Sequence, residues 1–103
     1  MRHLIFITFL LLSTTSFADE SKGEKLFKEY CWGCHHQTSM AFGPSFKEIA
    51  NKRNEGQMIS QIIDPANTYK QLGFKRNAMP PFNDLSMDEV KALVEFIKSY
   101  KDK

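Results

Sequence analysis

Apolar residues recur at helical spacing in several separate stretches of this chain. In the first, Leu26, Phe27 and Tyr30 share one helix face. No stretch alternates convincingly between apolar and polar residues, as a half-buried strand would. The pattern predicts an all-α fold of three to five helices joined by long loops. The expected helices cover residues 21–30, 45–53, 56–63 and the segment after Ser86.

The last of these helices has the clearest boundaries. The run Ser86-Met-Asp-Glu89 is a capping box, in which the Ser side chain accepts from a backbone N–H and the Glu side chain reaches back. Apolar residues then follow at helical spacing to Ile97. Between the other helices, Gly43-Pro44 indicates a turn, and Asp64-Pro65 is expected to end a helix and start a long loop.

The first 18 residues have the pattern of a secretory signal peptide rather than of a folded element. A basic start at Arg2 precedes the apolar run 4–12, and small residues lead to Ala18. We therefore expect a signal peptide over 1–18 and one exported domain over 19–103, located in the periplasm. The apolar run is short for a membrane span, although an uncleaved anchor is the alternative.

The charge of the expected domain is nearly balanced. Without Arg2, the 14 Lys and Arg residues of the whole chain fall to 13, against 12 Asp and Glu residues. This balance gives no electrostatic argument for nucleic-acid binding. A domain of this size has a marginal hydrophobic core, so we expect a covalent or metal-based group to stabilise it.

Both cysteines of the chain lie in the sequence Tyr-Cys-Trp-Gly-Cys-His-His, residues 30–36. Three chemistries compete for this motif. A disulfide or thioredoxin-like pair suits an exported protein, but such a pair should accompany a strand–helix unit, which the pattern lacks. A zinc site needs four ligands, usually from two separated pairs, and no second cluster exists in the sequence.

Covalent haem attachment is the third reading and the one that the spacing favours. On a helical turn, Cys31, Cys34 and His35 project from one side. The two thiols can then meet the two vinyl groups of one porphyrin while the imidazole faces the iron. Cys-x-x-Cys-His is the attachment motif of haem c, so we expect one covalently bound haem c with Cys31 and Cys34 as tethers and His35 as an iron ligand.

The chain from 19 onward resembles a small bacterial class I cytochrome c. The matching parts, spread over nearly the whole domain and in the family's order, are Gly23-x-x-x-Phe27, Cys31-Trp-Gly-Cys-His35, Gly43-Pro44, Met79-Pro-Pro-Phe82 and the capped last helix. The resemblance implies a cytochrome c-like fold around one haem with His and Met as axial ligands. It also implies that the carbonyl of Pro44 orients His35, and that Gly23 admits Phe96 or Leu93 where the first and last helices cross.

Elimination among the methionines selects the second axial ligand. Met1 belongs to the signal segment, Met40 follows His35 too closely, and Met58 falls on an apolar helix stripe. Met87 lies in the first turn of the last helix. Met79 remains, in a loop stiffened by two following prolines, and we expect it to be the sixth ligand, with a plain loop methionine as the alternative.

The second histidine of the motif is not expected to bind iron, because His36 is adjacent to His35 and cannot easily reach the opposite haem face. Wall residues of the haem site are expected among aromatic and aliphatic side chains: Phe42, Phe46, Phe74, Phe82, Ile59 and Ile63. The family's usual Trp before the Met loop is missing, which leaves Arg76 and Tyr69 as weak candidates for binding the haem propionates.

The resemblance implies one-electron transfer rather than enzymatic catalysis. Its partners would be redox proteins such as a respiratory reductase, a terminal oxidase or a haem peroxidase, and the protein would be a monomer with no stable membrane insertion after cleavage. Two alternative functions remain open. One is a haem enzyme or gas-binding protein with a labile sixth ligand, and the other is a redox subunit of a membrane respiratory complex.

Overall fold

A computed structural model of the chain describes residues 21–103, and the predicted signal segment 1–18 lies outside these residues. The described part forms five α-helices and one π-helical turn and contains no strand, as the pattern predicted. In chain order these are α1 (Lys22–Leu26), the π-helical turn η1 (Phe27–Cys31), α2 (Phe46–Lys52), α3 (Glu55–Ile63), α4 (Pro65–Thr68) and α5 (Met87–Lys98). Within these residues, no helix has the length and apolar character to cross a membrane.

The helix starts follow from local capping chemistry. The predicted capping box of α5 is present, with Glu89 N donating to Ser86 Oγ and Ser86 N donating to Glu89 Oε1. Hydrogen bonds to the Glu89 carboxylate from the Ser86 backbone N–H and, to a smaller extent, from the Ser86 side chain lower the pKa of this carboxyl. A second capping box, between Asn54 and Gln57 at the start of α3, was not anticipated.

The stretch after α3 differs from the prediction. Asp64-Pro65 does end α3, but Pro65 also begins the short helix α4 where a loop was expected. Proline suits the first helical position because its fixed φ is already helical and the N–H that it lacks would be unbonded there. Thr68 Oγ1 donates to the Asp64 carbonyl over 2.7 Å, which closes this single turn.

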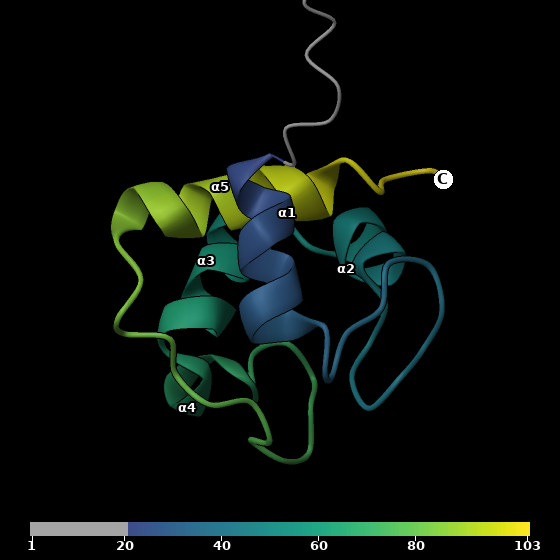
Figure 1. Cartoon of the computed structure of the whole chain (residues 1–103). Coiled ribbons are helices and arrows are strands. Elements are labelled where there is room, and N and C mark those ends of the chain that lie inside the picture. Colours follow the sequence, from purple (N-terminus) through teal and green to yellow (C-terminus); the bar gives the residue numbers. More distant parts are fainter. Residues whose placement is uncertain (1–20) are drawn as a thin grey trace, which may run out of the picture.

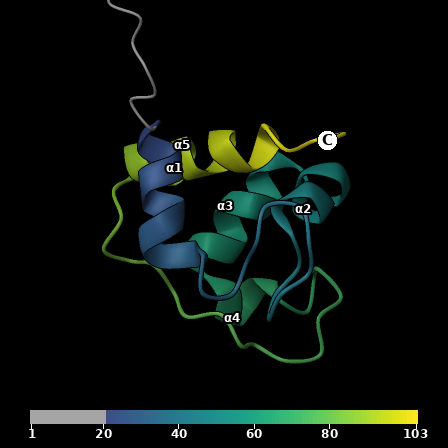
Figure 2. The same ribbon diagram turned by 45° about the vertical axis from the view of Figure 1, so that its right-hand side comes forward.

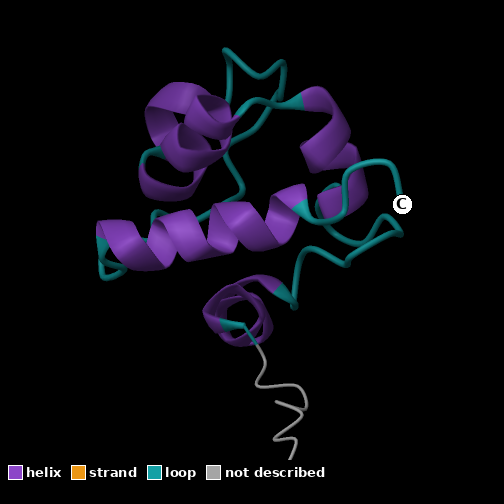
Figure 3. Cartoon of the chain, turned by 90° about the horizontal axis from the view of Figure 1, so that it is seen from above, coloured by secondary structure: helices purple, strands orange, loops and turns teal. Residues whose placement is uncertain are grey.

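The hydrophobic core lies where α1 crosses α5. Figure 1 shows α1 in front of α5, and Figure 3 shows α5 lengthwise with α1 seen end-on beside it. Phe27, fully buried, contacts the rings of Phe46 and Phe96 at centroid distances of 4.9 and 5.3 Å. The long connections before α2 and after α4 extend away from α5, toward the side where α4 lies (Figure 2).

Gly23 is buried at this crossing, as the resemblance implied. A Cβ at this position would lie 2.7 Å from Cβ of Phe96 and would also collide with the backbone carbonyl oxygen of Ala92. Of the two neighbours predicted for Gly23, Phe96 is confirmed. The other close neighbour is Ala92 rather than Leu93. Neither contact is the flexible end of a side chain, so the helices cannot approach this closely with any other residue.

Replacing Gly23 with Ala is therefore expected to destabilise the protein although Ala is the better helix former. Gly→Ala in a helix normally stabilises by roughly 0.5–1 kcal/mol, whereas forced overpacking costs about 1–3 kcal/mol. Thermal unfolding followed by circular dichroism measures the difference. The control is Gly56→Ala in α3, where the nearest atom to a new Cβ is 3.5 Å away. Equal melting temperatures for the two variants would contradict the close crossing.

Candidate functional site

The continuous helical segment formed by α1 and η1 places the start of the cysteine motif in the interior. Its last turn ends at Cys31, and the backbone N–H groups of Cys34 and His35 both donate to the Cys31 carbonyl, over 3.0 and 2.8 Å. This tight turn brings all three predicted side chains to one cavity. Cys31 is buried and Cys34 is exposed, so the pair spans the cavity wall from the interior to the surface.

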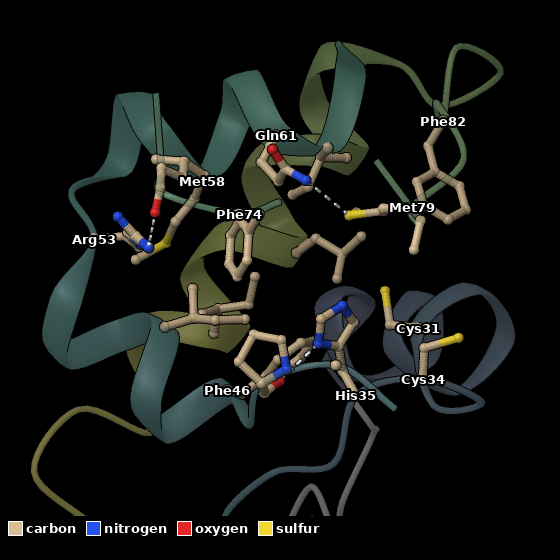
Figure 4. A pocket seen from close by; sticks show the side chains of 18 of the residues that line it. Cys31, Cys34, His35, Phe46, Arg53, Met58, Gln61, Phe74, Met79 and Phe82 are labelled. Atoms are coloured by element: carbon tan, nitrogen blue, oxygen red, sulfur yellow. Dashed lines mark hydrogen bonds between the residues drawn. The ribbon is translucent and has the colours of Figure 1, made fainter. Parts of the chain in front are cut away.

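The cavity has a volume of about 310 Å³ and a mostly apolar lining. It is bounded by the end of η1, by α2 and α3, by α5 and by the loop around Met79 (Figure 4). Of the expected wall residues, the four phenylalanines line it, but Ile59 and Ile63 pack against the core instead. Their places are taken by the aliphatic side chains Ile49, Ile62, Leu93 and Ile97.

His35 has a defined orientation. Its Nδ1 lies 2.7 Å from the carbonyl oxygen of Pro44. Because a carbonyl can only accept, Nδ1 carries the proton and Nε2 of the neutral ring keeps its lone pair. Figure 4 shows this second nitrogen turned toward the cavity. The imidazole is therefore oriented as a ligand histidine would be, with its other nitrogen held by a carbonyl.

The loop that supplies this carbonyl folds back tightly on the motif. Gly43 N donates to the Cys34 carbonyl over 2.6 Å, and Phe46 N donates to the His36 carbonyl over 2.9 Å. A Cβ on Gly43 would lie 2.6 Å from Cε1 of His35. Glycine is needed here because the backbone runs directly against the imidazole ring.

Met79 enters the cavity from the side opposite His35 (Figure 4). Its loop is attached to α3 by the backbone hydrogen bond from Phe82 N to the Ile62 carbonyl, 3.1 Å long. Met58 also lines the cavity, but Figure 4 shows it near Arg53, at the end away from the cysteines. Met40 and Met87 are exposed and do not line the cavity.

Three polar residues that line the cavity, Arg53, Gln57 and Gln61, were not anticipated from the sequence. Gln61 Nε2 lies 3.8 Å from Met79 Sδ. Arg53 lines the cavity, donates to the Leu72 carbonyl over 2.7 Å and lies over the Phe74 ring. The only sequence signal was that Gln61 borders the apolar stripe of α3, which equally fits an exposed residue; Arg53, at the end of α2, gave none. Of the two residues considered for haem propionates, Arg76 lines the cavity and Tyr69 does not.

The geometry gives little support to the disulfide, thioredoxin-like and zinc interpretations of the cysteine motif. Neither cysteine is in a disulfide. Burial, with a smaller contribution from Cys34, raises the pKa of Cys31 to about 12, whereas a redox-active thiol needs a lowered pKa. Among residues 21–103, no three His, Cys, Asp or Glu side chains come together to hold a metal ion. The ring of His36 contacts Trp32 outside the cavity.

Gly43→Ala is expected to displace the His35 ring, because the new methyl group occupies the space beside Cε1. The consequences are a weaker Nδ1 hydrogen bond to Pro44 and a loss of about 1–3 kcal/mol of stability. Thermal unfolding and the NMR signal of the Nδ1 proton measure them. Gly33→Ala is the matched control, since nothing lies within 4 Å of a Cβ there; an unshifted His35 signal in the Gly43 variant would contradict the tight fit.

Comparison with known proteins identifies the family of this chain. Residues 18–97 match a family model described as Cytochrome C oxidase, cbb3-type, subunit III. No curated protein and no solved structure matches the chain. The match covers most of the chain and includes the single Cys-x-x-Cys-His motif. The chain therefore belongs to this family of c-type cytochrome domains, and it is a small monohaem cytochrome that carries a covalently bound haem c with iron.

Proposed function

We propose that this protein is a periplasmic carrier of single electrons, in which Cys31 and Cys34 tether the haem and His35 and Met79 are its axial ligands. The observation that carries the proposal is that His35 and Met79 enter one apolar cavity from opposite sides, with both cysteines on its wall. When bound, haem c supplies an iron that cycles between Fe(III) and Fe(II).

The cavity suits haem by the chemistry of its donors. The two thiols lie on the His35 side, so Cys31 and Cys34 would hold the haem by thioether bonds within reach of the imidazole. The polar side chains Arg53 and Arg76 line an otherwise mostly apolar cavity, and Figure 4 shows Arg53 at the end away from the cysteines. A porphyrin has this same polarity, with vinyl groups at one edge and propionates at the other. We therefore assign the propionates to the Arg53 end.

The protein's own residues favour electron transfer over catalysis. The Pro44 carbonyl fixes the protonated Nδ1 of His35 and leaves Nε2 to bind. Met79, held by the stiff Pro80-Pro81 segment and by α3, lies on the opposite side, where as a ligand it would leave no open position on the iron for a substrate. A Met ligand and an apolar environment both raise the reduction potential.

Electrons would enter and leave at the edge of the site that reaches the surface. Cys34 is exposed there, and the neighbouring Trp32 is 55% exposed. An apolar contact area of this kind suits brief docking of redox proteins, for which a respiratory reductase, a terminal oxidase or a haem peroxidase are the candidates.

The ligand set is tested by replacing Met79 with Ala. We expect this variant to lose the Met-to-Fe(III) charge-transfer band at the near-infrared edge of the visible spectrum and to bind CO and cyanide readily. The matched control is Met58→Ala, because Met58 lines the same cavity at its far end. Retention of the band in the Met79 variant would refute the assignment and favour a haem enzyme or gas-binding protein.

A second function is favoured by the family match, whose description names a subunit of an oxidase. In that case the domain would belong permanently to a membrane respiratory complex. Fractionation of cells separates the two. A free carrier is expected in the soluble periplasmic extract as a monomer, whereas co-purification with an oxidase from detergent-solubilised membranes would favour the subunit.

A further inference from the structure

Among residues 21–103, Gln61 is the only side chain for which the structure records a hydrogen bond to the Met79 sulfur. It lies on α3 and lines the cavity, and its Nε2 is 3.8 Å from Met79 Sδ, at the distance of an N–H···S hydrogen bond (Figure 4). Gln61 directly precedes Ile62, whose carbonyl accepts from Phe82 N. The backbone thus already fixes α3 against the Met79 loop, and the amide makes its contact from this anchored position.

The other end of the Gln61 amide has no partner. Its Oε1 is buried and makes no hydrogen bond within the described residues. Turning the amide over would not help, because Oε1 would then face the lone pairs of the sulfur and Nε2 would lose its acceptor. A buried polar atom without a partner destabilises a protein, and each such atom in a native fold requires an explanation. An apolar side chain of similar size would avoid this cost.

Met79 has a physical need for such a donor. A methionine side chain has three rotatable bonds and adapts easily to its surroundings. The prolines stiffen its backbone but do not determine the direction of its sulfur lone pairs. A hydrogen bond to one lone pair leaves the other in a defined direction and also draws electron density from the sulfur.

We propose that Gln61 is a positioning residue that holds the Met79 thioether toward His35 and raises the reduction potential of the bound haem. The proposal rests on Met79 being the axial ligand. A polarised sulfur donates less to Fe(III), which stabilises Fe(II) relative to the oxidised form. Displacing Met79 from the iron also breaks this hydrogen bond and frees the side chain to rotate, and this loss outweighs the weaker donation, so Met79 is harder to displace. The unpaired Oε1 is the structural cost of having this donor beside the sulfur.

The test uses the haem-loaded protein with Gln61→Leu, which removes the donor and adds no possible ligand. We expect the variant to have a lower reduction potential than the native protein. We also expect imidazole to displace Met79 from the oxidised variant at about two- to tenfold lower concentration, which is the range that the loss of one hydrogen bond sets. Gln71→Leu is the control, because Gln71 is exposed, lies outside the cavity and donates only to Asn67. It should change neither quantity.

A melting experiment separates positioning from packing. With saturating imidazole Met79 is already displaced, so any remaining difference between the Leu variant and the native protein comes from packing and from the unpaired oxygen. We expect the variant to lose stability relative to the native protein only without imidazole. An identical difference with and without imidazole overturns the proposal, as does an unchanged potential and imidazole affinity.

Gln61→Asn provides the second variant if Gln61→Leu does not accumulate. It keeps an amide but is shorter by one methylene group, so its N–H no longer reaches the sulfur, and the same shifts are expected. The native spectrum distinguishes this proposal from the proposed function. If the native protein lacks the Met-to-iron band, both fail; if it has the band and neither Gln61 variant differs from it in potential or imidazole affinity, only the role of Gln61 fails.

Discussion

The close crossing of α1 and α5 at Gly23 is the contact on which the position of the site depends. α1 continues without a break into the turn that ends at Cys31. Any shift of α1 on α5 would therefore move both cysteines and His35. Phe27 strengthens this contact from one turn further on, because its ring is enclosed by Phe46 and Phe96. The core and the haem site thus share one supporting wall.

The two sides of the cavity are held by different means. On the His35 side, backbone hydrogen bonds tie the loop before α2 to the cysteine motif, and the ring itself is bonded to Pro44. On the Met79 side the loop is long and has one backbone bond to α3. The His35 side has a network of hydrogen bonds, whereas Met79 is held by the two prolines that follow it and by the side-chain amide of Gln61. The histidine is consequently the more firmly fixed of the two proposed ligands.

This asymmetry bears on the choice between carrier and enzyme. A haem domain with a firmly held histidine and an easily detached second ligand would bind small molecules at the iron. A haem domain in which both ligands are firmly held would transfer electrons only. The distinction does not lie in the cysteine motif, which is common to both. If Met79 is the ligand, the distinction lies in how strongly this loop methionine is retained, which by the contacts of Gln61 and Ile62 would depend on α3, far from the motif in the sequence.

The sequence by itself determined the attachment chemistry and the helical character of the fold. Cys31, Cys34 and His35 are local in the chain, so one turn of helix specifies their relation. The capping box at Ser86 is likewise local. Contacts between distant segments were only partly accessible: Gly23 at the crossing could be anticipated because an interior helix glycine requires a reason.

Tertiary structure alone decided which side chains meet in the cavity. Ile59 and Ile63 lie on the same apolar stripe as Met58 and Ile62, yet only the latter two line the cavity. Periodicity defines an apolar face but not which part of it meets the core and which the cavity. The sequence did not distinguish Gln61 from an exposed residue, because a polar residue beside an apolar stripe is expected to face solvent unless another segment covers it. The loop that carries Met79 supplies that cover for Gln61, and its path follows from packing rather than from local sequence.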